Sequence, residues 1–373
     1  MTIMHLIGTA EFAGTEQMVL TIGQGQIVRG HRVLVTTRER GKVGEYLADQ
    51  GLQVIAPKIG PVSAPFRVAS VCRQYGVDIL HSHLTSGTHV ANATSLLTGI
   101  PVVDHLHVYS KDVSHKVAAR RGKLIAVSNS VNEFYRENSR IDPSRIVTVL
   151  NGSSIVNDPD AKMDRELARK VVADELKLKT VPRFVTIAAR ITPQKGQDLF
   201  VGAAEKLAAS HPDVHFLMVG AAEDPEFAET IYASIRDRGL SDRVHRLGFR
   251  RDIAKLLRAS EVACVPSRFD PFPLSSLEPM LVGTPLVATR VGGIPECLHR
   301  PELGVLVEPE SVASLADGIH SLLSDAQWWQ CIAENAEAEA KQRYSVHAML
   351  DQIEAVYGSL LTPKREPGTS LAK

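Results

Sequence analysis

The sequence lacks several features that mark whole classes of protein. Its 373 residues include only four cysteines, none in a Cys-x-x-Cys pair, so no disulfide framework or cysteine metal site is indicated. No run of about 20 apolar residues is present, so we expect no membrane-spanning helix. Basic and acidic side chains balance at 42 each, so no net charge favours nucleic acid. The N-terminus resembles no signal peptide, and reduced core cysteines fit a cytoplasmic protein.

The length and the apolar content predict two domains. The chain is 44% hydrophobic, enough for two cores, and short apolar segments alternate with helical patterns. This alternation predicts parallel sheets covered on both faces. The predicted strands are 3–7, 32–36, 53–56, 78–81, 101–103, 124–127, 146–149, 183–189, 214–220, 244–248, 261–265, 286–288 and 304–307. The main predicted helices are 15–29, 197–209, 227–238, 274–281, 314–341 and 346–361.

The segment 264–296 carries the densest group of site signals. Its prolines keep the residues before 274 out of a helix, and helical spacing begins there. The first N–H groups of that helix have no internal partner and lie at the positive end of its dipole, so they suit a phosphate. Asp270 precedes the helix and Glu278 lies within it. Carboxylates repel phosphate but accept hydrogen bonds from hydroxyls, so this loop and helix end could together hold a sugar, a diphosphate and a ribose.

A second loop with residues suited to binding phosphate follows the strand 183–189. Arg190 and Lys195 flank it. Arginine can bind two phosphate oxygens at once, whereas lysine supplies a mobile point charge. Two solvated loop cations would explain this loop alone, but two such loops in one half of the chain favour a diphosphate site.

Histidines gather after two strands of the first half. His-Ser-His occupies 81–83 and Asp-His-Leu-His occupies 104–107. The carboxyl ends of strands face the ligand crevice in an open α/β sheet. Zinc binding is one interpretation, but no third ligand is spaced to complete a site, so we expect no metal. We expect His81 and His83 to bond local backbone groups instead.

A glycine also marks the first strand-to-helix turn. Gly14 precedes Thr15 there, and a glycine lets the backbone approach a phosphate closely. A simple tight turn explains Gly14 equally well. Gly23 and Gly25 lie inside the predicted helix without a third glycine, so the dinucleotide fingerprint of a dehydrogenase is absent.

These motifs together resemble the retaining glycosyltransferases of family 4, which have the GT-B fold. Asp270 and Glu278 match the acid-x7-acid signature of that family, and Arg190 with Lys195 matches its R-x4-K pair. Two positions depart from the pattern. Asp270 is one methylene shorter than the usual Glu, and Pro279 replaces the usual Ala.

The resemblance covers nearly the whole chain and is strongest over 188–296. It implies an α/β protein with two Rossmann-like domains that face each other across a cleft. The implied parts are an acceptor-side domain at 1–160, a nucleotide-sugar domain at 161–345, a helix at 346–361 that crosses back to the first domain, and a disordered tail at 362–373.

The implied activity is that of a hexosyltransferase. A hexose would pass from a nucleoside-diphosphate sugar, expected to carry UDP, to an acceptor hydroxyl with retained configuration, in bacterial polysaccharide or glycoconjugate biosynthesis. No cofactor or metal is expected, because protein cations and amides would neutralise the diphosphate. The expected partners are the donor and a saccharide, lipid-linked or small-molecule acceptor.

The resemblance also assigns roles to individual residues. Glu278 would bind the ribose, Asp270 would orient the sugar, and His107 would touch it from the other domain. The predicted catalytic residues are His107, Arg190, Lys195, Asp270 and Glu278. The predicted substrate contacts are Gly14, Thr15, Gly248, Phe249, Phe272, Pro273, Leu274 and Ser275, with the base read by the backbone of Gly248 and Phe249.

Two alternative functions stay open at this point. A nucleotide-sugar epimerase or hydrolase can share this two-domain plan, and a non-catalytic nucleotide-sugar binding protein would fit Asp270 and Pro279. A basic cluster also permits two interpretations, a solvated helix face or peripheral contact with an anionic membrane surface. Its members are Lys116, Arg120, Arg121 and Lys123.

Overall fold

The computed structural model describes residues 1–8, 14–37, 41–55 and 63–361. The chain divides into two compact units. Unit 1 comprises Met1–Val127, Val131–Val149 and Met349–Lys373, and unit 2 comprises Ser128–Ser130 and Leu150–Ala348. None of the helices in the described part of the chain is long and apolar enough to cross a membrane.

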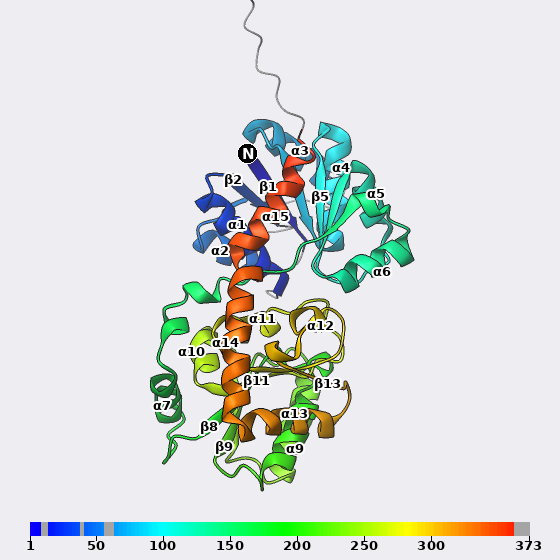
Figure 1. Cartoon of the computed structure of the whole chain (residues 1–373). Coiled ribbons are helices and arrows are strands. Elements are labelled where there is room, and N and C mark those ends of the chain that lie inside the picture. Colours follow the sequence, from blue (N-terminus) through cyan, green and yellow to red (C-terminus); the bar gives the residue numbers. More distant parts are fainter. Residues whose placement is uncertain (9–13, 38–40, 56–62, 362–373) are drawn as a thin grey trace, which may run out of the picture. The chain divides into compact units, whose positions relative to one another are not determined.

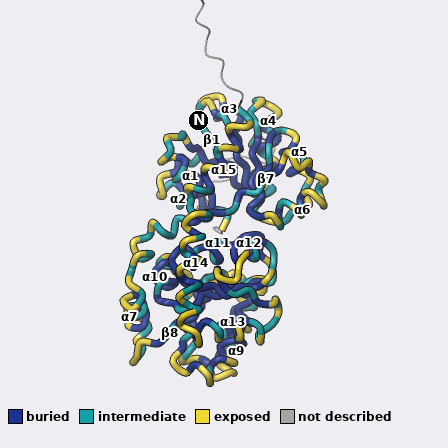
Figure 2. The backbone as a smooth tube through the Cα atoms, in the orientation of Figure 1, coloured by how far each residue is buried: buried dark blue, intermediate teal, exposed yellow. Residues whose placement is uncertain are grey.

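Unit 1 is built on a parallel sheet of seven strands, in the order β3-β2-β1-β4-β5-β6-β7. The order reverses between β1 and β4, which is where open α/β sheets bind ligands at the carboxyl ends of their strands. The central strands are buried (Figure 2), because helices cover both faces. The strands are β1 (Thr2–Ile7), β2 (Arg32–Thr36), β3 (Gln53–Ile55), β4 (Ile79–His83), β5 (Val102–Leu106), β6 (Gly122–Ala126) and β7 (Ile146–Thr148).

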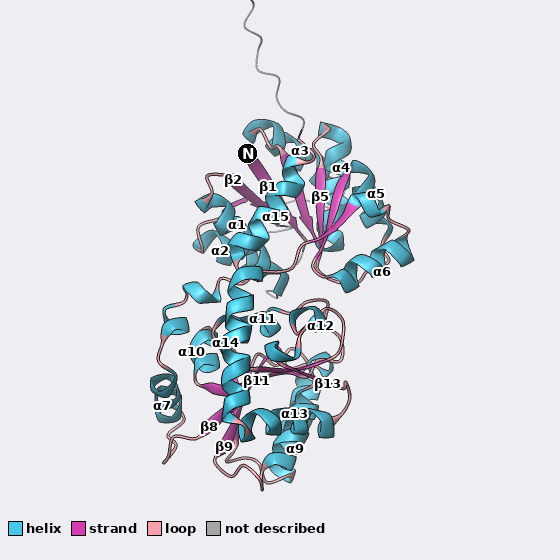
Figure 3. Cartoon of the chain, in the orientation of Figure 1, coloured by secondary structure: helices cyan, strands magenta, loops and turns pink. Residues whose placement is uncertain are grey.

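Two groups of helices flank this sheet (Figures 1 and 3). Gln26 of α1 bonds Tyr357 of α15 on one face. Thr88 of α4 and His115 of α5 bond Asp104 of β5 on the other face. The helices are α1 (Gly14–Val28), α2 (Lys42–Asp49), α3 (Ala64–Tyr75), α4 (Leu84–Thr98), α5 (Val113–Arg121), α6 (Asn129–Ser139) and α15 (Val346–Gly358), with the 3₁₀ helix η1 (Pro143–Arg145).

Unit 2 repeats this plan with a parallel sheet of six strands, in the order β10-β9-β8-β11-β12-β13. The order reverses between β8 and β11. Alternate residues of its strands enter different cores, since Val185 and Phe216 join one cluster whereas Phe184 and Leu217 join another. The strands are β8 (Arg183–Ala188), β9 (Val214–Val219), β10 (Val244–Gly248), β11 (Ser260–Val265), β12 (Leu286–Thr289) and β13 (Val305–Val307).

The helices of unit 2 supply the other side of each core. Phe200 of α8 and Ile319 of α13 join the first cluster, and Val172 of α7 joins the second. The α-helices are α7 (Arg165–Glu175), α8 (Gln197–Leu207), α9 (Pro225–Asp237), α10 (Ile253–Arg258), α11 (Leu274–Leu281), α12 (Ile294–Cys297), α13 (Val312–Ser324) and α14 (Ala326–Arg343). The 3₁₀ helices are η2 (Ile155–Asn157), η3 (Pro159–Lys162), η4 (Pro193–Lys195) and η5 (Pro301–Leu303).

Two features differ from the sequence-based expectation. The single helix predicted over 314–341 is wrong, because Asp325 adopts an extended conformation and its side chain caps a new helix at the N–H of Trp328. Unit 1 ends its second segment at Val149 rather than near residue 160, and the next residues join unit 2, where Ser153 N–H donates to the carbonyl of Tyr344. The predicted tail at 362–373 lies outside the described residues.

Candidate functional site

The predicted charged loops leave neighbouring strands of the unit 2 sheet. β8 and β11 pair in parallel, so the loops that follow them emerge at the same edge of the sheet, at the point where the strand order reverses. Lys195 follows β8 and Asp270 follows β11. The fold therefore brings the two halves of the sequence prediction to the position where sheets of this topology bind ligands.

Lys195 and Asp270 form a buried ion pair. The Nζ of Lys195 lies 2.5 Å from Oδ2 of Asp270, and the two side chains are only 14% and 6% exposed. Ser267 Oγ lies 3.4 Å from the same carboxylate oxygen. Burial raises the pKa of Asp270, and the positive charge of Lys195 opposes that rise. Each member of the pair therefore compensates the other's loss of hydration.

The two loops are also held together by direct bonds. The backbone N–H of Arg268 donates to the carbonyl of Gln194 at 2.8 Å, and the side-chain amide of Gln194 donates to the carbonyl of Phe269 at 2.7 Å. Gly196 has φ +73°, and a Cβ there would lie 2.2 Å from the carbonyl oxygen of Pro266. The close approach of the loops therefore requires glycine at this position.

Helix α11 begins at Leu274, as predicted. Pro273 is its N-cap residue with extended ψ of 140°, so the first two amides belong to Leu274 and Ser275 and have no acceptor within the helix. The preceding carbonyl, that of Phe272, accepts a bond of 3.0 Å from Nδ2 of Asn151. Asn151 therefore fixes the backbone that leads into the helix, a contact that the sequence did not reveal.

Glu278 lies partly buried on α11 beside a serine. Ser153 Oγ donates to Oε1 of Glu278 at 3.2 Å. Desolvation raises the pKa of Glu278 to about 7, against the lowering effect of the Ser153 bond. This carboxyl group is therefore divided between its neutral and charged forms near neutral pH.

The other predicted residues of unit 2 have different surroundings. Arg190 is 43% exposed and pairs with the carboxylate of Glu223. Gly248 has φ +64°, and its carbonyl accepts a bond of 2.8 Å from the N–H of Gly220. Phe249 follows with 64% of its surface exposed. The structure thus pairs Lys195 with Asp270 directly but places Arg190 in a different ion pair.

The predicted residues of unit 1 occupy two places. Gly14 and Thr15 begin α1, and a Cβ added to Gly14 would meet no atom within 4 Å of the described structure. His107 follows β5, and its Nε2 lies 2.9 Å from Nδ1 of His83. Burial lowers the pKa of His107 to about 3, so its imidazole is neutral near neutral pH.

The expectation that His81 and His83 bond local backbone groups is wrong. His81 Nδ1 lies 2.5 Å from the hydroxyl of Tyr357, and His83 Nε2 lies 2.9 Å from Nδ1 of His5. Both residues lie on a central strand whose backbone groups pair with its neighbours, so their rings project from the sheet and meet side chains.

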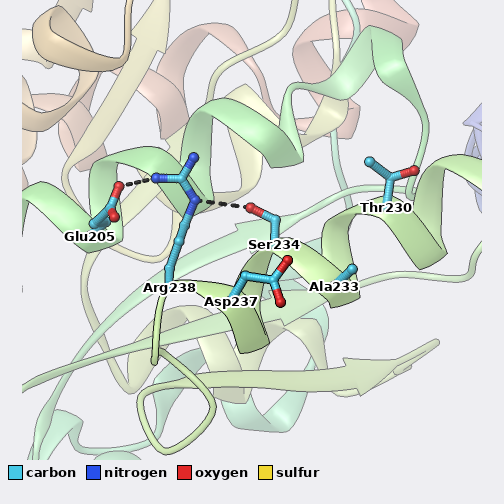
Figure 4. A pocket seen from close by; sticks show the side chains of 6 residues that line it. All are labelled: Glu205, Thr230, Ala233, Ser234, Asp237 and Arg238. Atoms are coloured by element: carbon cyan, nitrogen blue, oxygen red, sulfur yellow. Dashed lines mark hydrogen bonds and ion pairs between the residues drawn. The ribbon is translucent and has the colours of Figure 1, made fainter.

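A surface hollow of about 580 Å³ lies between α8 and α9, apart from these residues (Figure 4). Arg238, at the end of α9, bonds Ser234 one turn earlier at 3.0 Å and pairs with Glu205 of α8. Its lining includes none of the predicted site residues. We therefore place the candidate site at the loops after β8 and β11.

Two family models match the chain. The model described as "Glycosyl transferases group 1" matches residues 169–343, and that described as "Glycosyltransferase Family 4" matches residues 12–155. With two parallel-sheet α/β units, these matches define a glycosyltransferase of the GT-B class. The chain is therefore a glycosyltransferase of the GT-B fold that is similar to family 4.

Individual relatives agree with this assignment. The chain is 23% identical over 351 residues to a UDP-Gal:alpha-D-GlcNAc-diphosphoundecaprenol alpha-1,3-galactosyltransferase of Escherichia coli. The aligned region covers 88% of this chain and 89% of the relative. It is 25% identical to a D-inositol 3-phosphate glycosyltransferase of Corynebacterium diphtheriae, over 94% of this chain and 91% of the relative.

Solved structures share the fold. A glycosyltransferase from Rickettsia africae superimposes with a TM-score of 0.89 at 21% identity, covering 97% of this chain and 99% of that one. Anabaena Alr3699/HepE in complex with UDP and glucose gives a TM-score of 0.85 at 24% identity, covering 96% of this chain and 100% of that one.

Proposed function

We propose that this glycosyltransferase moves a hexose from a nucleoside-diphosphate sugar to an acceptor hydroxyl with retention of configuration. The observation that carries the proposal is the ion pair of Lys195 with Asp270. The pair lies on loops at the reversal point of the unit 2 sheet, before the first amides of α11, which have no acceptor within the helix. UDP is the proposed carrier, since the Escherichia coli relative is named for UDP-Gal and the Anabaena structure contains UDP.

Donor binding would exchange the partners of the cations. A diphosphate at the start of α11 attracts Lys195 more strongly than one carboxylate does, because it carries more negative charge. Asp270 is then released to accept hydrogen bonds from the hydroxyls of the sugar. Arg190 would likewise leave Glu223 for a phosphate oxygen. The ion pairs of the structure therefore keep the charged groups satisfied until the donor replaces them.

The same groups would stabilise the transition state. The bond between the anomeric carbon and the phosphate oxygen breaks, and negative charge grows on the departing diphosphate. Lys195, Arg190 and the amides of Leu274 and Ser275 offset that charge without a metal ion. The acceptor oxygen bonds the anomeric carbon on the face that the phosphate leaves, and its proton passes to the leaving phosphate oxygen.

The remaining assignments stay predictions of the same proposal. Glu278 binds the ribose hydroxyls, and the backbone of Gly248 and Phe249 contacts the base. His107, Gly14 and Thr15 are the residues of unit 1 predicted to contact the donor. Phe272 and Pro273 supply backbone groups beside the sugar.

The proposed acceptor is a saccharide chain of a bacterial surface polymer, built in the cytoplasm. The Escherichia coli relative is named for a lipid-linked acceptor, which supports peripheral contact with a membrane. Lys116, Arg120, Arg121 and Lys123 lie on α5 and β6 and carry the positive charge for such contact. Protein that fails to sediment with anionic vesicles at low salt would contradict this part of the proposal.

The central experiment separates transfer from the two alternatives. Nucleotide sugars are screened by thermal shift, and the donor that stabilises the protein is then incubated with acceptor pools, with and without EDTA. We expect acceptor-dependent release of UDP that EDTA leaves unchanged, and a product whose anomeric proton coupling in NMR matches that of the donor. Consumption of the donor without acceptor would indicate an epimerase or hydrolase. Donor binding with no turnover would indicate a non-catalytic binding protein.

A further inference from the structure

Unit 1 contains a cluster of five histidines, of which the proposed transfer reaction uses only His107. The histidine cluster consists of His5 on β1, His81 and His83 on β4, and His105 and His107 at the end of β5. In the sheet register His5 pairs with His81, and His83 pairs with His105. Because side chains alternate along a strand, this register places all five imidazoles on one face of three neighbouring strands.

Hydrogen bonds between side chains connect the cluster in a single line. His107 Nε2 meets His83 Nδ1 at 2.9 Å, His83 Nε2 meets His5 Nδ1 at 2.9 Å, and His5 Nε2 meets Oε1 of Gln26 at 2.8 Å. Each of these bonds uses one nitrogen of each ring. His5 and His83 therefore have both of their ring nitrogens occupied.

The line continues from the other end of the same glutamine. Nε2 of Gln26 donates to the hydroxyl of Tyr357 at 3.0 Å, that hydroxyl lies 2.5 Å from His81 Nδ1, and His81 Nε2 lies 3.2 Å from His105 Nδ1. The line ends there, because Nε2 of His105 is buried and has no hydrogen-bond partner among the described residues. A buried polar atom without a partner is costly, so a ligand that bonds this nitrogen would remove that cost.

The imidazole of His105 is one of three that gather near the end of β5. One nitrogen from each of His83, His105 and His107 falls within 4.8 Å of the others. The rings of His105 and His107 have centroids 4.3 Å apart. His107 Nδ1 has no hydrogen bond to any described residue, so two of these three rings present a nitrogen that the line does not use.

The chemistry of these rings suits a metal. In the bond between His83 Nδ1 and His107 Nε2, one nitrogen accepts and therefore carries a lone pair in place of a proton. Neutral imidazole is the form that binds metal ions, and it prefers zinc, copper, nickel and iron over magnesium or calcium. Such an ion would convert the unpartnered nitrogen of His105 into a ligand.

We propose that His83, His105 and His107 bind one divalent transition-metal ion of the zinc class. Tetrahedral coordination at about 2.0–2.1 Å requires ligand nitrogens roughly 3.3 Å apart. The His83–His107 contact of 2.9 Å would open slightly to admit the ion, which replaces the shared proton. The rings of His105 and His107, whose planes are 20° apart, would rotate out of their stacked arrangement. Three histidines leave a fourth position for water or another donor.

A second group of three, formed by His5, His81 and His83, is less suitable. Its nitrogens also lie within 4.8 Å of one another, but both nitrogens of each ring already have partners in the line. A metal there would have to break several satisfied bonds. The group of His83, His105 and His107 is therefore the better metal site, because the ring of His105 has an unpartnered nitrogen.

The test measures binding rather than catalysis. Full-length protein is stripped with a chelator, dialysed, and titrated with Zn²⁺ by calorimetry and with Co²⁺ by visible absorption. We expect one tight equivalent, a tetrahedral Co²⁺ spectrum, and a melting temperature that rises with Zn²⁺. His105→Asn and His107→Asn should each weaken this binding by at least about tenfold, the loss that even outer partners of a metal ligand typically cause.

A second histidine pair provides the matched control. His215 and His245 stack on adjacent strands of unit 2 with nitrogens 2.8 Å apart, so His215→Asn removes a comparable imidazole elsewhere. That variant should retain the tight equivalent. Stripped wild-type protein that takes up no stoichiometric Zn²⁺ or Co²⁺ would overturn the proposal, as would binding that survives both His105→Asn and His107→Asn. Because His107→Asn changes a less buried ring, it tests the proposal even where His105→Asn fails to fold.

Discussion

The two sheets of this protein share one strand order and differ in what they place at its reversal point. In unit 2 the loops after β8 and β11 bring a lysine and an aspartate together. In unit 1 the neighbouring strands β1, β4 and β5 carry neutral imidazoles at the corresponding edge. The topology therefore determines where polar side chains lie close together. The residue types determine whether those side chains are charged, as in unit 2, or neutral, as in unit 1.

The difference also shows how each unit meets the cost of burial. Unit 2 keeps charged groups by pairing opposite signs, as Lys195 does with Asp270. Unit 1 avoids charge, because burial lowers the pKa of its clustered histidines and each ring bonds a neutral neighbour. On the two proposals above, the charged site would receive an anion such as a diphosphate, whereas the neutral site would receive a cation.

The largest expected effect tests whether unit 2 holds the anion site. Lys195→Ala should lower kcat/KM by about 100-fold or more, because it removes a cation from the departing diphosphate. Steady-state kinetics with the preferred donor measure the loss. Lys206→Ala, at an exposed position on the following helix α8, is the control and should keep normal activity. Near-normal activity of Lys195→Ala would show that Lys195 does not form an anion site in unit 2, and the proposed difference between the two units would then be wrong.

Removing Glu278 should have an effect of similar size. Glu278→Ala deletes the proposed acceptor for the ribose hydroxyls, and we expect kcat/KM to fall by about 100-fold. Glu229→Ala changes an exposed glutamate of α9 and serves as the control. If both variants behave alike in the kinetic assay, Glu278 is not part of the site.

The neutral variant of Asp270 should separate binding from transfer. Asp270→Asn keeps the size of the side chain but frees Lys195, so UDP affinity measured by calorimetry should change little. Transfer should fall by roughly 10- to 100-fold, the worth of a hydrogen bond to a charged group. Asp317→Asn, exposed on α13, is the control. Equal losses of binding and transfer would make Asp270 a structural residue that only supports Lys195.

The raised pKa of Glu278 predicts a dependence of stability on pH. The folded protein holds this proton more tightly than the unfolded chain, since the pKa rises from 4.5 to about 7. The stabilising contribution is therefore complete below pH 4.5, declines as the pH rises to about 7, and changes no further above it. Glu278→Gln cannot ionise, so the free energy of unfolding of the wild type minus that of the variant should decline over this range. A difference that rises with pH in urea titrations would contradict the assignment.

The smallest expected effect concerns Ser153. Its hydroxyl lowers the pKa of Glu278, so Ser153→Ala should move the acidic limb of the kcat/KM profile to higher pH and lower activity at neutral pH by less than about tenfold. Ser154→Ala, whose side chain caps no helix, should leave the profile in place. An unshifted profile in Ser153→Ala would show that the serine does not control the carboxyl group.

Local sequence signals predicted most of the fold and part of the site. The short apolar strands and the turn before Leu274 were identified because burial and helix termination depend on nearby residues. The spacing of Arg190 and Lys195 indicated a phosphate-binding loop, and the structure places Lys195 on Asp270. Arg190 instead pairs with Glu223, a partner on the loop after β9 that spacing alone does not reveal.

Other contacts depended on long-range geometry. Ser153 meets Glu278 across 125 residues, and no motif marks it. His5 lies beside His81 because β1 and β4 pair in register, and Tyr357 of α15 bonds His81. The motif His-Ser-His by itself does not reveal either of these partners. The break at Asp325 was missed because helical spacing continues on both sides, although an aspartate at a cap position was the available signal.

Helix α15 has a consequence for how the protein is made. Its residues from Met349 onward belong to unit 1, where Tyr357 bonds Gln26 and Glu354 pairs with Arg29. During synthesis the ribosome releases the strands of unit 1 first and this helix only after unit 2. Unit 1 therefore begins folding first but cannot complete its own interior until translation has passed the whole of unit 2.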